Sequence, residues 1–219
     1  MVSDDSFIEL NRRVLRANDL VSGGLRERFA HAGIRVANLI SAPGTGKTEL
    51  VVALGELAAS AGVEMAVLVG DCATDNDARR IAASCPMVRQ IVTDGLCHLE
   101  ASMIGEALSG FDLAEIDLLL IENVGNLVCP SDFDLGEDLK VALLSVTEGE
   151  DKPLKYPHLF SSADLVVVTK LDLAEAAGCD LGELGANIAA VNPGALVIYT
   201  SARSGDGIGQ LFKVLAVGG

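Results

Sequence analysis

The sequence lacks any apolar run long enough to cross a bilayer, which takes roughly 20 residues. Residues 1–19 are polar and acidic, without the basic and then apolar stretch of a secretory signal. Positive charge is also scarce: 16 Lys and Arg face 31 Asp and Glu, for a formal net charge of −15. This balance argues against a nucleic acid or an anionic membrane as the main partner. We therefore expect a soluble, cytoplasmic protein.

The sequence has no C-x-x-C pair, no repeat and no low-complexity linker. Its five cysteines are odd in number and widely spaced: Cys72, Cys85, Cys97, Cys129 and Cys179. In an intracellular setting such cysteines are thiols or metal ligands rather than disulfides. At 219 residues, half of them hydrophobic, the chain can build one domain with a sizeable core.

Short apolar runs alternate with longer amphipathic segments along the chain. The first segment, Asp4–Ala30, has helix-like spacing of its apolar residues. Seven later runs mostly lack polar alternation, as strands buried on both faces do: 34–40, 65–69, 88–92, 118–121, 141–146, 165–168 and 195–199. Helices are expected between them at 48–59, 78–83, 99–108, 181–191 and 207–215. The pattern predicts an α/β fold, a mostly parallel seven-stranded sheet with helices on both faces, over residues 34–219, preceded by a helical extension at residues 1–33.

The stretch Ser41–Thr48, SAPGTGKT, follows a predicted strand and opens a predicted helix. It matches a Walker A phosphate-binding loop, except that Ser41 replaces the usual Gly. Glycines let successive backbone N–H groups converge on phosphate oxygens, and the helix N-terminus adds its dipole. Lys47 is expected to reach the β- and γ-phosphates and Thr48 to bind Mg²⁺. The predicted nucleotide contacts here are Gly44, Thr45, Gly46, Lys47, Thr48 and Glu49. The alternative is a glycine-rich turn that merely ends in Lys-Thr.

Two sequence motifs, each directly after one of the last two predicted strands, indicate which nucleotide base the protein binds. Residues 169–172, TKLD, resemble the N-K-x-D element of GTPases, with Thr in place of Asn. Asp172 is expected to accept hydrogen bonds from the guanine ring N–H and amine, a donor pair that adenine lacks, while the stem of Lys170 lies against the base. Residues 200–203, TSAR, are similar to the S-A-K element, which adds Ser201, Ala202 and Arg203 as predicted contacts. Asp172 alone could simply cap a helix, but the two matches together favour GTP over ATP.

The most specific stretch is IENVGNLVCP at residues 121–130, continuing into DFDLG at 132–136. It resembles the HypB family of SIMIBI-class P-loop GTPases, which incorporate nickel during [NiFe]-hydrogenase maturation. Three more matches lie in the expected order. Residues 70–81 resemble the first switch, 97–101 (CHLEA) the metal-binding run, and 146–157 a lysine-bearing loop that reaches the partner subunit's nucleotide. The related urease-maturation GTPases carry a different glycine-rich segment in place of ENVGNLVCP.

The metal candidates are Cys97, His98 and Cys129. By spacing alone an adjacent Cys-His pair is usually structural, but the resemblance implies a metal site. Thiolate and imidazole suit Ni²⁺ or Zn²⁺, and three ligands leave room for a transferable ion or a site shared across a dimer. Residues 1–33 hold one histidine and no cysteine, so a tight N-terminal nickel site is not expected. No ligand role is predicted for Cys72, Cys85, Cys179, His31 or His158.

Three carboxylates and a lysine complete the predicted hydrolytic site. Asp71 and Glu122 end strands and can hold Mg²⁺ directly or through water. The resemblance ties Asp77 to Mg²⁺ and the attacking water. Each of these acids could also be a solvated surface residue. In place of an arginine finger, Lys155, preferred over Lys152, would be supplied across the dimer.

The resemblance thus implies a GTP-hydrolysing metallochaperone that uses GTP/GDP, Mg²⁺, and Ni²⁺ or Zn²⁺. Its implied partners are a second copy in a nucleotide-dependent homodimer, a nickel-delivery accessory protein like HypA, and the hydrogenase large subunit. Three alternatives remain open. They are an ATP-dependent kinase or synthetase on the same scaffold, a nucleotide-gated interaction module with a purely structural Cys/His site, and a urease-type nickel accessory GTPase.

Overall fold

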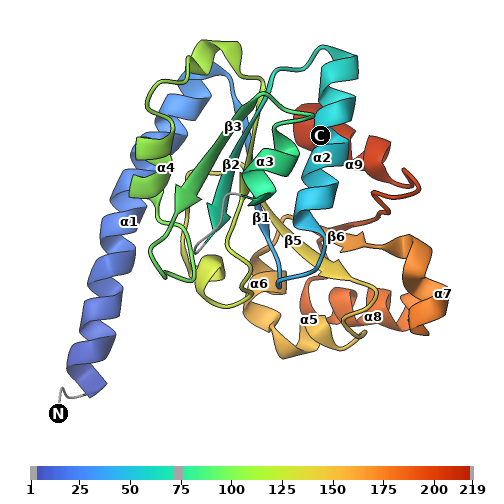
Figure 1. Cartoon of the computed structure of the whole chain (residues 1–219). Helices are drawn as coiled ribbons and strands as arrows, with labels where there is room; N and C mark the ends of the chain where they lie inside the picture. The colour runs from blue at the N-terminus through green and yellow to red at the C-terminus, as the bar shows by residue number, and fades with distance from the viewer. Residues whose placement is uncertain (1–3, 72–75, 218–219) are drawn as a thin grey trace.

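Seven parallel strands form one sheet at the centre of the computed structural model, which describes residues 4–71 and 76–217 (Figure 1). The strands are β1 (Arg35–Ile40), β2 (Met65–Asp71), β3 (Met87–Val92), β4 (Leu118–Glu122), β5 (Leu139–Ser145), β6 (Leu165–Thr169) and β7 (Leu196–Tyr199). Their order is β3-β2-β4-β1-β5-β6-β7, and every pairing is parallel. All seven predicted strands are confirmed, and the sheet is entirely rather than mostly parallel.

Helices connect the strands. They are α1 (Asp4–Ala32), α2 (Lys47–Ala61), α3 (Asn76–Ile81), α4 (Ala101–Ala107), α5 (Lys152–Lys155), α6 (Pro157–Ser162), α7 (Ala174–Ala177), α8 (Leu181–Val191) and α9 (Ile208–Val217), with 3₁₀ turns η1 (Leu113–Glu115), η2 (Cys129–Asp132) and η3 (Leu171–Leu173). The six predicted helices are all present. The short helices α5, α6 and α7 were not predicted, because so few residues display little helical period. The similarly short α3 was predicted, but at 78–83, two residues after its observed bounds.

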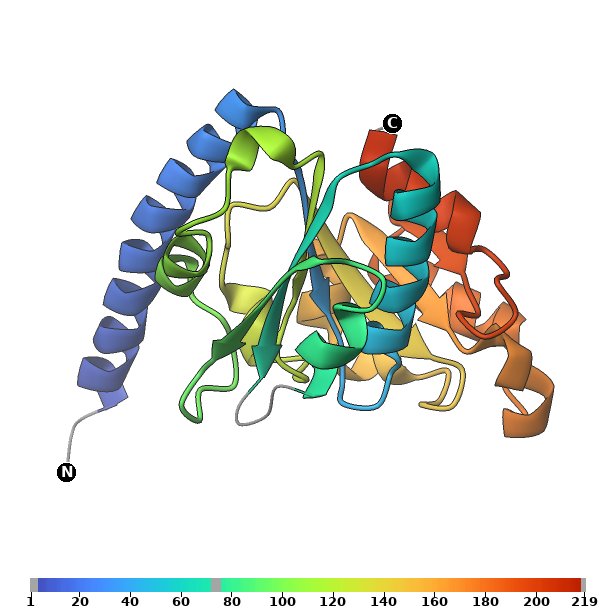
Figure 2. The ribbon, with the colours of Figure 1, turned by 45° about the horizontal axis from the view of Figure 1, so that its top comes forward.

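Both faces of the sheet are covered (Figure 2). Successive strand residues point to opposite faces. In β4, Leu118 and Leu120 pack with α2, α3 and α9, whereas Leu119 and Ile121 pack with α1 and α4 on the other face. Helices α6 and α8 extend this second layer over β5 and β6. The strands are therefore buried from both sides, which explains their apolar sequences.

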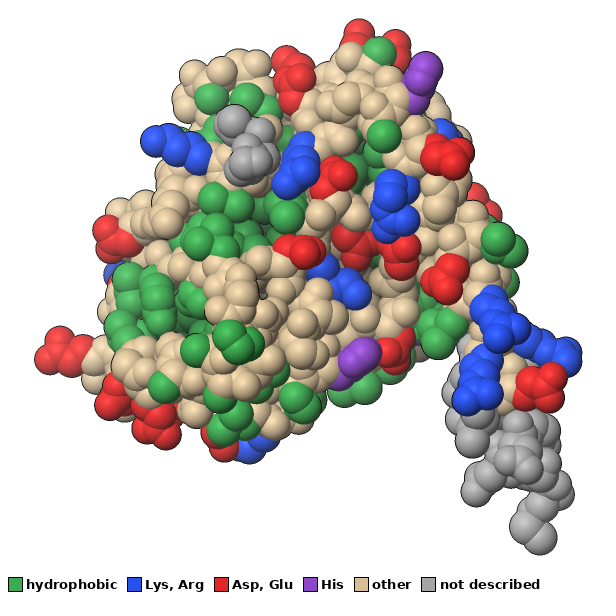
Figure 3. Space-filling model, turned by 180° about the vertical axis from the view of Figure 1, so that it is seen from behind, with side chains coloured by type: hydrophobic (Ala, Val, Ile, Leu, Met, Phe, Trp, Pro, Cys, Tyr) green, Lys and Arg blue, Asp and Glu red, His purple; other side chains and the backbone are tan. Residues whose placement is uncertain are grey.

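Helix α1 packs its second half against α4 through Leu25 and Phe29, both almost fully buried. Its first half runs past the sheet edge, away from the rest of the chain (Figures 1 and 2). Basic side chains gather on this projecting part, in contrast to the acidic balance of the whole chain (Figure 3). They belong to Arg12, Arg13 and Arg16. No helix among residues 4–71 and 76–217 has both the length and the apolar character needed to span a bilayer.

The strand order reverses beside β1, whose neighbours β4 and β5 lie on its two sides. In doubly wound parallel sheets, ligands bind where the strand order reverses, outside the carboxyl ends of the strands. The loops after β1, β2, β4 and β6 leave the sheet at this edge, and they carry the predicted phosphate, magnesium and base residues.

Candidate functional site

The loop between β1 and α2 has the backbone geometry of a phosphate cradle. Gly44 and Gly46 have φ of +77° and +99°, a region that glycine enters without a Cβ clash. Ser41 needs no such freedom, since the non-glycine residues with positive φ in the described chain are Asp94 and Lys170. Its fully buried hydroxyl instead accepts a hydrogen bond from Lys47 Nζ at 2.8 Å. The serine therefore gives the loop lysine a fixed partner.

Beside the cradle lies a buried pair of oxygen ligands. Thr48 Oγ1 donates to Glu122 Oε1 at 2.9 Å. Glu122 is 3% exposed, and its other oxygen, Oε2, has no hydrogen-bond partner among the described residues. Burial raises the pKa of Glu122 to about 7 and lowers that of the neighbouring Lys47. A buried carboxylate oxygen without a partner, next to a hydroxyl, fits a Mg²⁺ ion, which prefers oxygen ligands.

A cavity of ≈ 570 Å³ joins these groups to described residues of the stretch 70–81, the predicted first switch. Asp71, at the end of β2, and Asp77, in α3, both line it with Lys47, Thr48 and Glu122. Residues 72–75 of this segment, including Cys72, lie outside the described residues. The structure thus places the predicted magnesium residues around one space.

Arg80 also lines this cavity, and the sequence reasoning assigned it no role. Its guanidinium pairs with Glu49 of α2 and lies 3.5 Å from Asp77 Oδ1. The residue stands inside the stretch 70–81 that resembled a switch, so its position in that motif was the signal that could have singled it out.

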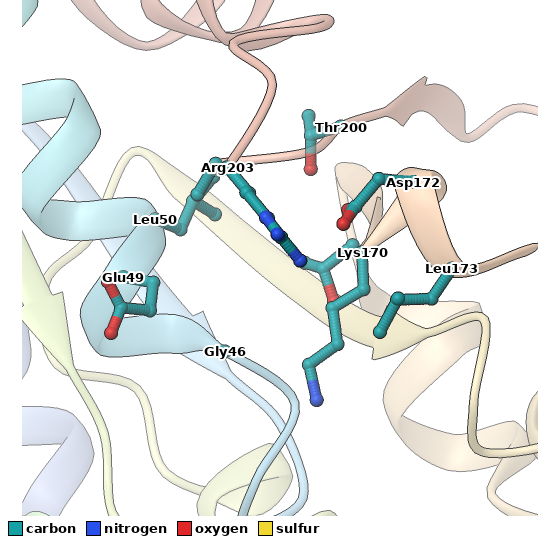
Figure 4. Close-up of a pocket in the computed structure, with 10 residues that line it drawn as sticks. Gly46, Glu49, Leu50, Lys170, Asp172, Leu173, Thr200 and Arg203 are labelled. Carbon is teal, nitrogen blue, oxygen red and sulfur yellow. The ribbon is translucent and has the colours of Figure 1, made fainter.

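A second cavity, of ≈ 410 Å³, adjoins the first and holds the predicted base residues. The side chains of Lys170, Asp172 and Arg203 lie around the same space, with Thr200 and Leu173 at its wall (Figure 4). Asp172 Oδ1 accepts from Ser201 Oγ at 2.6 Å, which orients the carboxylate.

Lys170 and Thr169 tie this pocket to the phosphate loop. Lys170 Nζ donates to the Gly44 carbonyl at 2.6 Å. Thr169, which replaces the usual asparagine, donates its buried hydroxyl to the Thr45 carbonyl at 2.6 Å. The substitution keeps a contact to the loop but provides no amide.

The metal candidates come together from two loops. Cys97 and His98 follow β3, whereas Cys129 begins η2 after β4, and the ligand atoms of all three lie within 4.8 Å of one another. They form the one such cluster of three found in the described part of the chain. The His98 ring stacks on Phe133, with centroids 3.9 Å apart, and burial lowers its pKa. The imidazole is therefore neutral at pH 7, the form that binds a metal.

The other cysteines and histidines that the structure describes are not part of this cluster. Cys85 is buried, and burial raises its pKa to about 11, which makes it an unreactive thiol. Cys179 is partly exposed and lies beside Glu150. His158 Nε2 lies 2.7 Å from Asp132 Oδ1, so this histidine contacts the turn that carries Cys129.

The two candidate lysines differ in their surroundings. Lys152 is mostly buried and pairs with Glu148, whose other oxygen accepts from Thr45 in the phosphate loop. Lys155 lies on the surface, with its side chain 62% exposed and paired with Asp151 at 2.6 Å. Lys155 is therefore the more exposed of the two side chains, and its role across a dimer stays a prediction.

One segment connects the phosphate site to the metal cluster. Glu122 begins it, and Cys129 ends it. Between them, Asn123 Oδ1 accepts from the backbone N–H of Leu99, next to His98, at 3.3 Å. A Cβ on Gly125 would lie 3.0 Å from Pro43 Cγ, so this glycine lets the segment lie directly on the phosphate loop.

Comparisons with known proteins agree with this geometry. A family model described as "CobW/HypB/UreG, nucleotide-binding domain" matches residues 35–199. The chain is 47% identical to hydrogenase maturation factor HypB of Azotobacter vinelandii, over 95% of this chain and 69% of that protein. It is 46% identical to the Escherichia coli (strain K12) factor, over 95% and 72%. The chain belongs to the HypB family. It is therefore a GTPase of the CobW/HypB/UreG class, as predicted, and not an ATP-dependent kinase or synthetase.

Two solved HypB structures share its fold. Helicobacter pylori HypB, crystallised in complex with nickel, is 35% identical and superposes with a TM-score of 0.86, covering 91% of this chain and 93% of that one. HypB of Archaeoglobus fulgidus is 36% identical, with a TM-score of 0.82 over 91% and 97%. The signal recognition particle 54 kDa protein of Aeropyrum pernix, in complex with GDP, is 15% identical, with a TM-score of 0.58 over 81% of this chain and 43% of that one. It shows the fold alone.

Proposed function

We propose that this HypB-family chain is a GTP-driven metallochaperone that delivers nickel during hydrogenase maturation. One observation carries the proposal: Cys97, His98 and Cys129 present three metal ligands within 4.8 Å of one another, on loops joined to the phosphate cavity. The names of its relatives, hydrogenase maturation factors, and the nickel complex of the H. pylori relative support it.

In the nucleotide site, Asp172 reads guanine, and Ser201 orients the Asp172 carboxylate through its hydrogen bond. Lys170, Ala202 and Arg203 line the same cavity. Gly44, Thr45, Gly46 and Lys47 hold the phosphates, with Glu49 at the edge of both cavities. Thr48, Glu122 and Asp71 hold Mg²⁺, which neutralises charge on the phosphates when it is bound. Asp77 orients the attacking water, and Lys155 of each chain serves the partner's nucleotide in a GTP-dependent homodimer.

The transported ion is Ni²⁺, with Zn²⁺ as an alternative occupant. Two thiolates and one imidazole suit either ion, and the open coordination position allows transfer. The proposed setting is the cytoplasm, and the proposed partners are a HypA-like nickel donor and the hydrogenase large subunit. Within the chain, residues 34–219 act as the GTPase domain and residues 1–33 as a helical extension.

A metal titration tests the proposal against a purely structural Cys/His site. Ni²⁺ and Zn²⁺ are titrated into the protein, the Cys97→Ser/Cys129→Ser variant and the control Cys179→Ser, which lies outside the cluster. We expect one tight site in the protein and in the control, and its loss in the double variant. GTP hydrolysis with Mg²⁺, but without added Ni²⁺ or Zn²⁺, should be retained in all three. Equal binding by the double variant would disprove the metal site.

A further inference from the structure

Helix α1 carries a buried asparagine that contacts both metal-bearing segments. Asn18 is 7% exposed, and its Nδ2 donates to the Asp134 carbonyl at 2.7 Å. Its Oδ1 accepts from the backbone N–H of Ala101 at 2.8 Å. Ala101 follows shortly after His98, and Asp134 follows shortly after Cys129. The two ends of a single amide therefore hold the two loops that supply the ligands.

Further contacts from the same face of α1 secure the second loop. Ser22 Oγ donates to Asp134 Oδ2 at 2.9 Å, and Arg26 pairs with Asp134 Oδ1 at 2.6 Å. Positions 18, 22 and 26 are four apart, so they lie on one face of a helix. A Cβ on Gly136 would lie 3.0 Å from Leu25 Cβ, which shows how closely this loop lies on α1.

On the nucleotide side, the ties between the two loops are longer. Asn123 accepts from Leu99 at 3.3 Å, and Asn126 Nδ2 donates to the Cys97 carbonyl at 3.4 Å. Both donor–acceptor distances are longer than those of most N–H···O hydrogen bonds. The two Asn18 hydrogen bonds are slightly shorter than the most common length. The shortest of these contacts thus come from α1.

We propose that Asn18 is a positioning residue for the metal site, which sets the separation of the Cys97–His98 pair from Cys129. The inference rests on the proposed metal function of these three residues. Without the Asn18 side chain, the N–H of fully buried Ala101 and the carbonyl of Asp134 lose their partner. The loops then shift, and the three ligands no longer converge. Residues that orient metal ligands typically cost 10- to 100-fold in metal affinity when they are changed.

The experiment compares Asn18→Ala with a matched control, Asn192→Ala. Asn192 also donates its side-chain amide to two backbone carbonyls, those of Phe160 at 3.0 Å and Ala163 at 2.9 Å, in a region without metal ligands. Ni²⁺ affinity and the thiolate-to-nickel charge-transfer spectrum are measured on the whole chain, with circular dichroism to verify folding. We expect Asn18→Ala to lower Ni²⁺ affinity by about 10-fold or more and to alter the spectrum. Asn192→Ala should change neither, and GTP affinity should be unchanged in both.

Arg26→Gln provides a milder second variant, since Arg26 is exposed and its loss leaves no buried group without a partner. It should weaken nickel binding in the same direction but by less, and it carries the test if Asn18→Ala does not fold. Wild-type nickel affinity and spectrum in a folded Asn18→Ala protein would overturn the role of Asn18, and so would an equal loss in Asn192→Ala. If Asn18→Ala does not fold, unchanged nickel binding by Arg26→Gln would do the same. None of these outcomes would affect the proposed metal site. Nickel binding that survives Cys97→Ser would overturn the metal site itself, and the role of Asn18 with it.

Discussion

At the scale of single residues, two departures from common GTPase motifs have clear structural roles. Ser41 replaces a glycine, and its hydroxyl accepts from Lys47. Thr169 replaces an asparagine, and its hydroxyl donates to the phosphate loop at Thr45. Each hydroxyl steadies the loop. Because threonine has no amide to offer the base, we expect discrimination of guanine to depend all the more on Asp172.

The first prediction concerns the specificity of Asp172. A carboxylate accepts two hydrogen bonds from guanine, whereas an amide can donate to the extra oxygen of xanthine. Asp172→Asn should therefore weaken GTP binding by about 10- to 100-fold, since hydrogen bonds to charged groups are worth about 1.5–3 kcal/mol. Xanthine nucleotides should bind better than they do to the unchanged protein. Affinities for GTP, XTP and ATP are measured by calorimetry.

Asp206→Asn is the matched control for this prediction. It removes the same charge from the neighbouring loop, where Asp206 accepts from Ser204 outside the base cavity. Its nucleotide preference should be that of the unchanged protein. Equal affinity of the unchanged protein for GTP and ATP would contradict the assignment of residues 169–172 and 201–203.

The second prediction concerns pH and Glu122. Burial raises its pKa from the ordinary 4.5 to about 7 in the folded chain. Between these pH values the folded chain binds more protons than the unfolded chain, so the free energy of unfolding falls as the pH rises. Glu122→Gln removes this fall. From pH 5.5 to pH 8, the variant should gain about 2 kcal/mol of stability relative to the parent, measured by urea unfolding without nucleotide or metal.

The comparison separates Glu122 from titrating groups that do not interact with it. Burial also raises the pKa of Glu137, but this residue is present in both proteins and its effect cancels. Parallel stability profiles for the two proteins across this pH range would show that Glu122 titrates normally in the folded chain.

At the scale of secondary-structure elements, the sequence was most informative where elements were long or buried. All seven strands could be predicted, because strands covered on both faces are continuous apolar runs. The 11 residues of α8 were also predicted, at their observed bounds. Helices α5 and α6 instead begin around prolines and contain about one turn, so no apolar period could develop in them.

The candidate site was predictable only where its residues stand in contiguous motifs. The phosphate loop, the base residues and the Cys-His pair are of this kind. Asn18 is not, because an isolated asparagine in a helix has no distinguishing pattern. Its two partners lie 83 and 116 residues away, so only the folded chain brings them together.

The third prediction concerns the segment that joins the two sites. Gly125 contacts the phosphate loop so closely that a Cβ would lie 3.0 Å from Pro43 Cγ and 3.2 Å from its Cα. Gly125→Ala should push the loop and the segment apart. We expect GTP affinity to fall by about tenfold, the effect of about 1.4 kcal/mol, measured with a fluorescent nucleotide.

Gly24→Ala is the control for this element. Gly24 lies inside α1, and a Cβ there meets nothing within 4 Å. Because alanine favours helix over glycine by about 1 kcal/mol, this variant should be somewhat more stable and bind GTP normally. Unchanged GTP binding by Gly125→Ala would mean that the contact with Pro43 does not constrain the loop.

At the scale of the whole molecule, two segments that line the phosphate cavity reach the metal cluster. Gly70 precedes Asp71 at the end of β2, and a Cβ on it would lie 2.8 Å from the Leu99 side chain, next to His98. On the other side, Glu122 is joined to Cys129 through one short segment. We therefore expect that a displacement of Asp71 or Glu122 on binding of GTP and Mg²⁺ would also move the metal ligands on both loops.

The last prediction follows from this double connection. We expect GTP to favour a dimer in which the Cys97 and Cys129 residues of two chains converge, and GDP to loosen it and release the ion. Thermodynamic linkage then requires that metal change GTP affinity by the same factor by which GTP changes metal affinity. Such coupling is typically about 1–3 kcal/mol, or roughly 5- to 150-fold. Ni²⁺ affinity is measured with GDP and with a non-hydrolysable GTP analogue, beside the molecular mass by light scattering. Identical Ni²⁺ affinities and an unchanged molecular mass in both nucleotide states would disprove the coupling between nucleotide and metal binding. The assignment as a GTPase would not be affected.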